Sequence, residues 1–224
     1  QEVWTDGDGP LLDLIPWAVW NENDAGPHIT LGVCVGRDRE SGHHNAAPYR
    51  MLRLDSRRAT MNFAPGRDLG IFRSRYIEAG APMPAAVAIG VDPMTVFAAA
   101  CPFNPEVDEL DMVGALLGDP LEMVQCRSID LEVSATAKIV LEGRIIPEIT
   151  APDGPFGEYH GYYGPPHRVP VFEVSAATHR KDPILELHVT SDIKTAIIVN
   201  DDIDPFDWDA VKWALFTRFN PAVD

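Results

Sequence analysis

The chain has 224 residues, of which 46% are hydrophobic and 23% charged, an ordinary globular composition that allows a sizeable core. With 34 Asp and Glu against 18 Lys and Arg, its formal net charge of -16 argues against binding to nucleic acid or to an anionic membrane surface. No segment has the roughly 20 consecutive apolar residues that cross a bilayer, and the N-terminal QEVWTDGDGP lacks a signal-peptide pattern, so we expect a cytoplasmic protein. The three cysteines are widely spaced without a CxxC pair, which predicts reduced thiols and no zinc site.

The predicted elements are mostly short strands separated by Pro and Gly. Val- and Ile-rich strands are expected over residues 28–36, 49–55, 85–91, 131–146 with a break near Ser134, 169–177 and 194–200. Helices are expected over residues 69–79, 93–101, 109–117 and 208–218, with Asp92 as the N-cap of the second and with Gly80 and Gly118 closing the first and third. Because strands outnumber helices and do not alternate with them regularly, the pattern favours an α+β fold over a doubly wound α/β fold.

The C-terminal end of the sequence looks incomplete. Residues 180–204 pass from a strand through a basic turn directly into another buried strand, and the sequence stops just after the predicted helix 208–218. That helix would have little to pack against. We therefore expect the chain to lack parts of a complete domain.

The stretch APDGPFGEYHGYYG, residues 151–164, places two acids around a Gly-Pro-Phe-Gly segment. This segment excludes a helix between Asp153 and Glu158, so both carboxylates are expected on a turn that can bring them into one space. Two carboxyl groups held close together by a cation have different pKa values, so one can act as a proton donor while the other stays an anion. A solvated surface turn, or a two-carboxylate hydrolase such as a glycosidase, would present the same pair.

The segment DGPFGEYHGYYG resembles the EGPFGE…GYY signature of the UbiD family of prenylated-FMN-dependent decarboxylases. Further resemblance follows in the family's order, in GHHNAAPYRMLRLD, PAAVAIGVDPMTVFAAACPF, DELDMVGALLGDPLEMVQC, SATAKIVLEG and IIVNDDIDPFDWDAVKWALFTR. Several motifs in one order are more specific than any one of them. The resemblance implies a sheet-rich flavin-binding domain similar to the family's split β-barrel over residues 1–188, and part of a C-terminal α/β domain over residues 189–224.

The resemblance also implies a catalytic network of Arg50, Asp153 and Glu158. Glu158 would be the proton donor, Arg50 would hold the substrate carboxylate, and Asp153, which is one methylene shorter than the Glu usual in the family, would orient Arg50. Considered without the resemblance, Arg50 alternates with Leu52 and Leu54 on an apolar strand face, where a guanidinium needs carboxylate partners. The alternative is an edge-strand arginine that reaches water.

The resemblance implies that a divalent metal, Mn²⁺ or Mg²⁺, ties the flavin phosphate to the protein, and it suggests K⁺ as a further ion. Asn45, Asp68 and Glu109 match the metal ligands, although Asp68 stands where the family has His and would equally suit the N-cap of a helix beginning at Leu69. Such an oxygen-rich set suits Mn²⁺ or Mg²⁺ better than Zn²⁺. The neighbouring His43 and His44 point opposite ways on an extended segment, so at most one of them could join the ligands.

The residues implied to contact prenylated FMN are Ala47, Tyr49, Arg50, Ala99, Ala100, Cys101 and Lys194, of which Lys194 could instead be an ordinary solvated lysine at a strand end. The function implied is that of a carboxy-lyase, which decarboxylates an aromatic, heteroaromatic or α,β-unsaturated acid reversibly and without oxidation. A flavin prenyltransferase would supply the cofactor, and the family's habit is a homodimer or a higher homo-oligomer. The departures at Asp68 and Asp153 leave open a non-catalytic subunit of the same family, one that binds flavin or serves assembly.

Overall fold

The structure is a computed structural model that describes residues 2–63, 66–104, 107–158, 160–181 and 183, together with the backbone of two short strands at 185–187 and 196–198. The predicted cofactor contact Lys194 and the predicted helix 208–218 lie outside the described residues.

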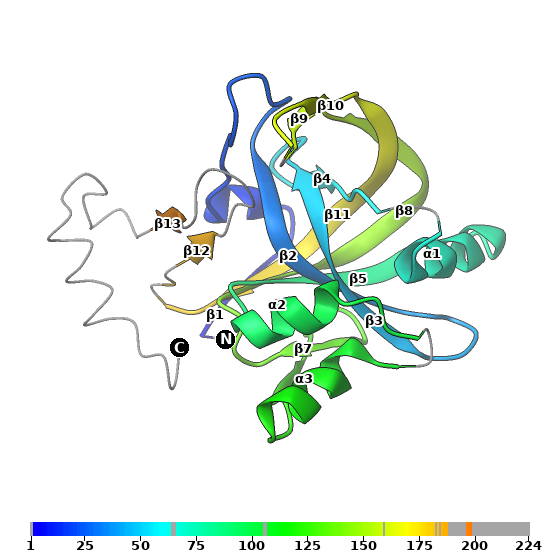
Figure 1. The fold of residues 1–224 in the computed structure, drawn as a ribbon. Coiled ribbons are helices and arrows are strands. Elements are labelled where there is room, and N and C mark those ends of the chain that lie inside the picture. Colours follow the sequence, from blue (N-terminus) through cyan, green and yellow to red (C-terminus); the bar gives the residue numbers. More distant parts are fainter. Residues whose placement is uncertain are drawn as a thin grey trace, which may run out of the picture.

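A curled antiparallel sheet forms the body of the protein (Figure 1). Its seven strands are β1 (Val3–Asp6), β2 (His28–Arg37), β3 (His44–Leu52), β4 (Arg58–Thr60), β5 (Met83–Ile89), β8 (Ile139–Asp153) and β11 (His167–His179). The order is β1-β11-β8-β5-β2-β3, and β4 pairs with β11. Isolated bridges from Asn62 to Arg50 and from Ala59 to Arg53 also join the β4 region to β3, so the sheet closes into a barrel.

The long strands β8 and β11 bend to make this closure possible. Their pairing shifts register between Pro170 and Phe172 and between Val174 and Ala176, and such irregularities increase the local twist of a strand. A Cβ atom added to Gly143 on β8 would lie 2.1 Å from the carbonyl oxygen of Glu173 on β11. Glycine is therefore required where the two backbones approach most closely.

In the described residues, three helices and three small strand pairs accompany the barrel. The helices are α1 (Asp68–Glu78), α2 (Pro93–Ala100) and α3 (Glu109–Leu117), and a 3₁₀ turn, η1, covers Leu11–Leu14. The strand pairs are β6 (Met123–Gln125) with β7 (Glu132–Ser134), β9 (Phe156–Gly157) with β10 (Tyr163–Gly164), and β12 (Leu185–Leu187) with β13 (Ala196–Ile198). In the part of the chain that the structure describes, no helix has the length and apolarity needed to cross a membrane.

The core has two layers that lie on opposite faces of the sheet. Large side chains such as Met51, Leu141 and Phe172 fill the barrel interior together with Leu11 and Leu12 of η1. On the outside, a second cluster packs the sheet against α2, α3 and the β6–β7 pair, and it includes Val33, Ala46, Ala99, Leu110 and Val133. Strands β2, β3, β5 and β8 contribute side chains to both layers and are therefore packed from two sides.

The α+β, sheet-rich architecture predicted from the sequence is confirmed. Three predicted helix ends also hold: Asp92 accepts a hydrogen bond from the Thr95 backbone N–H at the start of α2, and Gly80 and Gly118 take left-handed conformations after α1 and α3. Asp68, however, is the first residue of α1, and Arg67 occupies the cap position without a side-chain hydrogen bond, so the alternative reading of Asp68 as the cap of this helix does not hold.

Two further expectations need correction. Strand β3 begins at His44 and ends at Leu52, so Leu54 lies beyond it, 37% exposed, and does not continue an apolar face with Arg50. Strand β8 extends to Asp153, so this acid ends a strand instead of lying on a turn. Pairing with β11, which includes Asp153 opposite His167, carries β8 further than its local Pro and Gly content suggested.

Candidate active site

Arg50 lies between the two predicted acids and forms ion pairs with both. Its Nη2 and Nε groups donate to Asp153 Oδ1 at 2.6 and 3.2 Å, and its Nη1 group donates to Glu158 Oε1 at 3.1 Å. The Arg50 side chain is 17% exposed, and Asp153 is fully buried. Charge-assisted hydrogen bonds to two carboxylates compensate the partial burial of the guanidinium.

Asp153 is held from a second side by Thr60. The Thr60 hydroxyl donates to Asp153 Oδ2 at 2.6 Å and accepts from the Leu52 backbone N–H at 2.8 Å. Both Asp153 oxygens are therefore engaged, one by Arg50 and one by Thr60. The side chain, although shorter than the Glu expected from the resemblance, reaches Arg50 directly.

The closure of the barrel brings these residues together from distant parts of the sequence. Arg50 is on β3 at the seam with the β4 region, where the Asn62 backbone N–H donates to the Arg50 carbonyl at 3.0 Å. Asp153 ends β8, and Gly154 then turns the chain with a φ of 97°, a conformation that favours glycine. The turn leads into β9, and Glu158 follows directly after it.

The Phe156 ring lies under the Arg50 guanidinium. The Arg50 Cζ atom is 4.4 Å from the ring centroid, and the edge of the His28 imidazole meets the same ring at 4.7 Å between centroids. The aromatic face supports the cation electrostatically. Phe156 was not among the residues predicted from the sequence, although its place between the two acids was a usable signal.

Next to this network, a cavity of about 250 Å³ gathers the other predicted residues. It is lined by Asn45, Ala47, Pro48, Tyr49, Arg67, Asp68, Ala99, Ala100, Cys101, Pro102, Phe103 and Glu109. Every predicted cofactor and metal residue in the described part of the chain lines it except Arg50, which follows Tyr49 directly on β3. Burial raises the pKa of the Tyr49 hydroxyl, which therefore stays protonated and neutral.

Asn45 and Glu109 form a buried pair at one side of this cavity. The Asn45 amide donates to Glu109 Oε1 at 2.8 Å, and the Ala46 backbone N–H donates to Glu109 Oε2 at 3.0 Å. Burial raises the pKa of Glu109, and the charges of Asp108 and Asp68 raise it further. The Asn45 Oδ1 atom is buried without a hydrogen-bond partner.

The Asn45 amide oxygen is buried and unpaired, and burial disfavours the charged form of the neighbouring Glu109 carboxylate. Both groups would be compensated by a hard divalent cation, which prefers oxygen ligands. Among the described residues, no three His, Cys, Asp or Glu side chains are grouped so as to hold a metal by themselves. Asn45, Asp68 and Glu109 contribute an amide and two carboxylates, so a cation bound here would take further oxygen ligands from outside the protein chain. A phosphate group is such a ligand.

Arg67 is a cavity residue that the sequence analysis missed. It is exposed, lines the cavity beside Asp68, and precedes an α1 N-terminus that has no side-chain cap. A helix N-terminus with a cation next to it favours an anion. The signal in the sequence was a basic residue two positions before the predicted helix start at Leu69.

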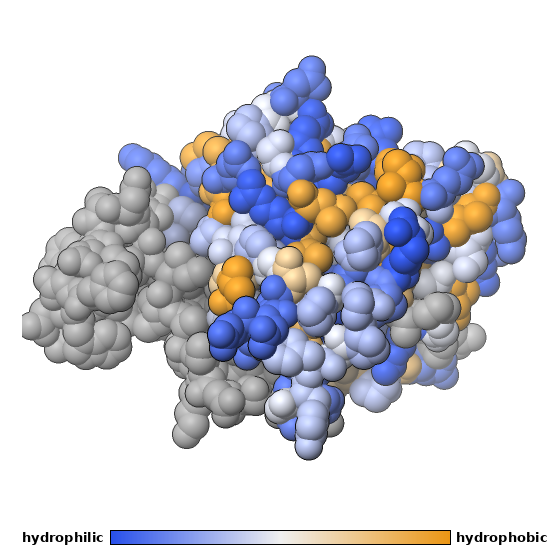
Figure 2. Space-filling view, turned by 90° about the horizontal axis from the view of Figure 1, so that it is seen from above, coloured by the Kyte–Doolittle hydropathy of each residue, from blue (hydrophilic) through white to orange (hydrophobic). Residues whose placement is uncertain are grey.

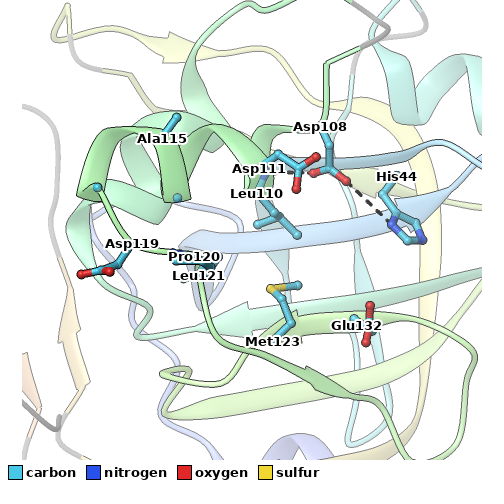
Figure 3. A pocket seen from close by; sticks show the side chains of 12 residues that line it. His44, Asp108, Leu110, Asp111, Ala115, Asp119, Pro120, Leu121, Met123 and Glu132 are labelled. Atoms are coloured by element: carbon cyan, nitrogen blue, oxygen red, sulfur yellow. Dashed lines mark hydrogen bonds and ion pairs between the residues drawn. The ribbon is translucent and has the colours of Figure 1, made fainter.

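A second cavity, of about 650 Å³, is lined by residues of α3, β6 and β7 (Figure 3). Asp108, Asp111, Asp119 and Glu132 line it together with His44, and none of its described lining residues is Lys or Arg. Such a wall repels a phosphate or a carboxylate. Because His44 faces this cavity while the adjacent Asn45 faces the smaller one, His44 does not join the Asn45 and Glu109 pair.

Figure 2 looks onto the end of the barrel that carries β9 and β10, where hydrophobic patches lie among hydrophilic side chains. Of the residues after the acidic turn, Tyr162 is 74% exposed and Tyr163 39% exposed. These rings are accessible at the rim and do not fill the core.

Comparisons with known proteins bear on the whole chain. The sequence model of the UbiD family, described as the 3-octaprenyl-4-hydroxybenzoate carboxy-lyase Rift-related domain, matches residues 1–192, and that of the C-terminal domain of the same carboxy-lyase matches residues 182–224. An uncharacterized protein of Synechocystis sp. is 36% identical over 184 residues, and one of Archaeoglobus fulgidus is 37% identical over 174 residues. These alignments cover 82% and 77% of this chain but only 37% and 36% of the relatives, so the chain spans little more than a third of their length.

Among solved structures, the chain is similar to the UbiD-class enzyme HmfF from Pelotomaculum thermopropionicum, in an evolved dimeric form with prFMN, at a TM-score of 0.82 and 29% identity, covering 100% of this chain and 67% of that one. The 3,4-dihydroxybenzoic acid decarboxylase of Klebsiella pneumoniae gives a TM-score of 0.77 and 29% identity, covering 85% and 42% of the two chains. The vanillic acid decarboxylase of Sedimentibacter hydroxybenzoicus, at 24% identity, has the same fold with a TM-score of 0.82 and covers 100% and 63%.

Proposed function

Because the chain belongs to the UbiD family, we propose that it is the cofactor-binding part of a carboxy-lyase that uses prenylated FMN. The reaction would be the reversible, non-oxidative decarboxylation of an aromatic, heteroaromatic or α,β-unsaturated acid. The observation that carries the proposal is the Arg50 guanidinium clasped by Asp153 and Glu158 beside a cavity that gathers the expected cofactor residues.

The two acids have different surroundings, which supports different roles. Asp153 is fully buried and both of its oxygens are engaged, so it can orient Arg50 but cannot deliver a proton to a substrate. Glu158 is 38% exposed and touches Arg50 through Oε1, which leaves it able to approach a bound molecule. Glu158 is therefore assigned as the acid that protonates the substrate carbon after CO₂ has left.

Arg50 has two tasks in this assignment. Its charge attracts the substrate carboxylate, and its fixed place between two acids keeps the Glu158 side chain near that carboxylate. The Phe156 ring under the guanidinium limits the directions in which Arg50 can move.

Asn45, Asp68 and Glu109 would hold a Mn²⁺ or Mg²⁺ ion, and the uncapped α1 N-terminus with Arg67 would face the flavin phosphate. When bound, prenylated FMN supplies the electron-accepting centre that makes loss of CO₂ possible. A requirement for K⁺, a flavin prenyltransferase as supplier, a cytoplasmic location and a homodimeric or larger assembly are parts of the same proposal.

The test uses the protein co-expressed with a flavin prenyltransferase. The absorption spectrum and the mass of the released cofactor report binding, and a panel of aromatic, heteroaromatic and acrylic-type acids is screened for CO₂ release. Glu158→Gln is expected to keep the cofactor and lose turnover by about 10²-fold or more. Normal turnover in Glu158→Gln would refute the assignment of the proton donor.

Two alternatives predict other outcomes. A non-catalytic flavin-binding or assembly subunit would carry the cofactor and release no CO₂ from any acid of the panel. A two-carboxylate hydrolase would carry no flavin, and the engagement of both Asp153 oxygens already argues against a free pair of acids flanking a sugar.

A further inference from the structure

A loop of the N-terminal region lies against the acidic turn, although the two segments are far apart in the sequence (Figure 1). The Gly157 backbone N–H donates to Asp24 Oδ1 at 2.9 Å, across 133 residues. The Ala25 backbone N–H donates to the Pro155 carbonyl at 2.9 Å. Two consecutive residues therefore hold the turn that leads to Glu158: Asp24 accepts a hydrogen bond from it, and Ala25 donates one to it.

Asp24 connects this contact to the shape of its own loop. Its second oxygen, Oδ2, accepts from the backbone N–H groups of Trp20 and Asn21 at 3.2 and 2.9 Å. One carboxylate thus closes the loop with one oxygen and holds Gly157 with the other. A displacement of Asp24 would release both at once.

The fit between the loop and the turn is close. A Cβ atom on Gly157 would lie 2.4 Å from Asn21 Nδ2, so any other residue at this position would require the Asn21 side chain to move. The Asn23 backbone N–H donates to the Tyr163 hydroxyl at 3.1 Å, which joins the same loop to β10. The loop therefore contacts β9 and β10, the strands on either side of Glu158.

The position of Glu158 depends on its backbone. Its side chain is 38% exposed and lacks the surrounding packing that holds Asp153. Its backbone N–H donates to the Tyr162 carbonyl and its carbonyl accepts from the Gly161 N–H, both at 2.9 Å, so its backbone is fixed within a small turn that begins directly after Gly157. We propose that Asp24 is a positioning residue, which fixes this turn so that the Glu158 carboxylate stays within reach of Arg50; its effect on turnover rests on the proposed function.

The test compares Asp24→Ala and Asp24→Asn with Glu22→Ala, which removes an exposed acid from the same loop. Hydrogen–deuterium exchange of peptides covering residues 154–158 measures how firmly Asp24 holds the turn, and it does not require an active protein. Asp24→Ala is expected to raise this exchange about tenfold, because one hydrogen bond and the loop closure are lost together. Asp24→Asn, which keeps one acceptor oxygen, should recover part of the protection, and Glu22→Ala should match the wild type.

Turnover of the flavin-loaded protein is the second measurement. Asp24→Ala is expected to lower kcat by about tenfold to a hundredfold, with KM and bound flavin unchanged, since Glu158 and Arg50 are no longer held together. Exchange at the wild-type rate in Asp24→Ala would show that Asp24 does not hold the turn. Raised exchange with an unchanged kcat, or with kcat and KM changed together, overturns the positioning role. A wild-type protein without turnover refutes the proposed function, and the exchange result then decides by itself whether Asp24 holds the turn.

Discussion

The Thr60 hydroxyl donates a 2.6 Å hydrogen bond to Asp153 Oδ2, and both residues are completely buried. This contact joins β4 to the end of β8, and the same hydroxyl accepts from the Leu52 backbone N–H across the seam between β3 and β4. Because Asp153 also accepts from Arg50, the hydroxyl supports the proposed catalytic network and the closure of the fold together.

Replacement of Thr60 by Val is therefore expected to lower the free energy of unfolding by about 1–3 kcal/mol, since it leaves a buried carboxylate oxygen and the Leu52 N–H unpaired. Urea denaturation measures this loss. Thr60→Ser keeps the hydroxyl and removes one methyl group, so it should cost only about 1 kcal/mol. A valine variant as stable as the serine variant would contradict the assigned hydrogen bonds.

Glu109 gives a prediction about how the stability of the protein depends on pH. Its pKa is raised from the ordinary value of 4.5, chiefly by burial, so its contribution to stability is full below that pH and is lost as the pH rises through the folded-state pKa. In metal-free protein, the free energy of unfolding of the wild type is therefore expected to fall as the pH rises from 4.5 towards neutral, and Glu109→Gln, which has no titrating group, should lose less stability over this interval. Thermal unfolding in the presence of a chelator measures the change.

Added Mn²⁺ should then distinguish the two proteins at neutral pH. The ion is expected to stabilise the wild type and to leave Glu109→Gln unaffected, because binding to the native state stabilises it by mass action. Glu132→Gln, in the other cavity, is the matched control and should respond to Mn²⁺ as the wild type does. Equal stabilisation of the wild type and Glu109→Gln would exclude Glu109 as a metal ligand.

Much of the site could be predicted from the sequence because its residues stand in short motifs. Asn45, Arg50 and Glu158 are recognisable from their neighbours, and the structure places each of them at the network or the cavity. The caps of α2 and α3 were also predictable, since capping depends on a few adjacent residues.

Contacts between distant segments could not be predicted in this way. Strand β4 has three residues and forms only because β11 and β3 lie on either side of it. Asp24 carries no local mark of its role, because its partner Gly157 is 133 residues away. The extension of β8 to Asp153 likewise follows from pairing with β11, which single-sequence propensity does not contain.

Arg67 should contribute to cofactor affinity through the phosphate alone. A charge-assisted hydrogen bond contributes about 1.5–3 kcal/mol, so Arg67→Ala is expected to raise the Kd for FMN about tenfold to a hundredfold. Riboflavin, which lacks the phosphate, should bind the variant and the wild type equally, and flavin fluorescence titration measures both. Arg39→Ala, which changes an arginine stacked on Tyr76, is the control; an equal loss of affinity for riboflavin and FMN would place Arg67 away from the phosphate.

His28 should make the protein sensitive to mild acid. Its side chain is 1% exposed, and burial lowers its pKa from the ordinary value of 6.5 against the smaller opposing effects of its hydrogen bond to Gly26 and the charge of Asp153. Between the folded-state pKa and 6.5 the unfolded chain binds more protons than the native one, so the free energy of unfolding falls as the pH drops below 6.5.

Replacement of His28 by Phe keeps an aromatic ring against Phe156 and removes the titrating group. The stability lost between about pH 7.5 and about pH 5.5 should therefore be smaller in His28→Phe than in the wild type, as urea midpoints at the two pH values will report. His167→Gln controls for the loss of an exposed imidazole. If His28→Phe lost as much stability as the wild type over this interval, the acid sensitivity would have to come from groups other than the buried histidine beside the Arg50 network.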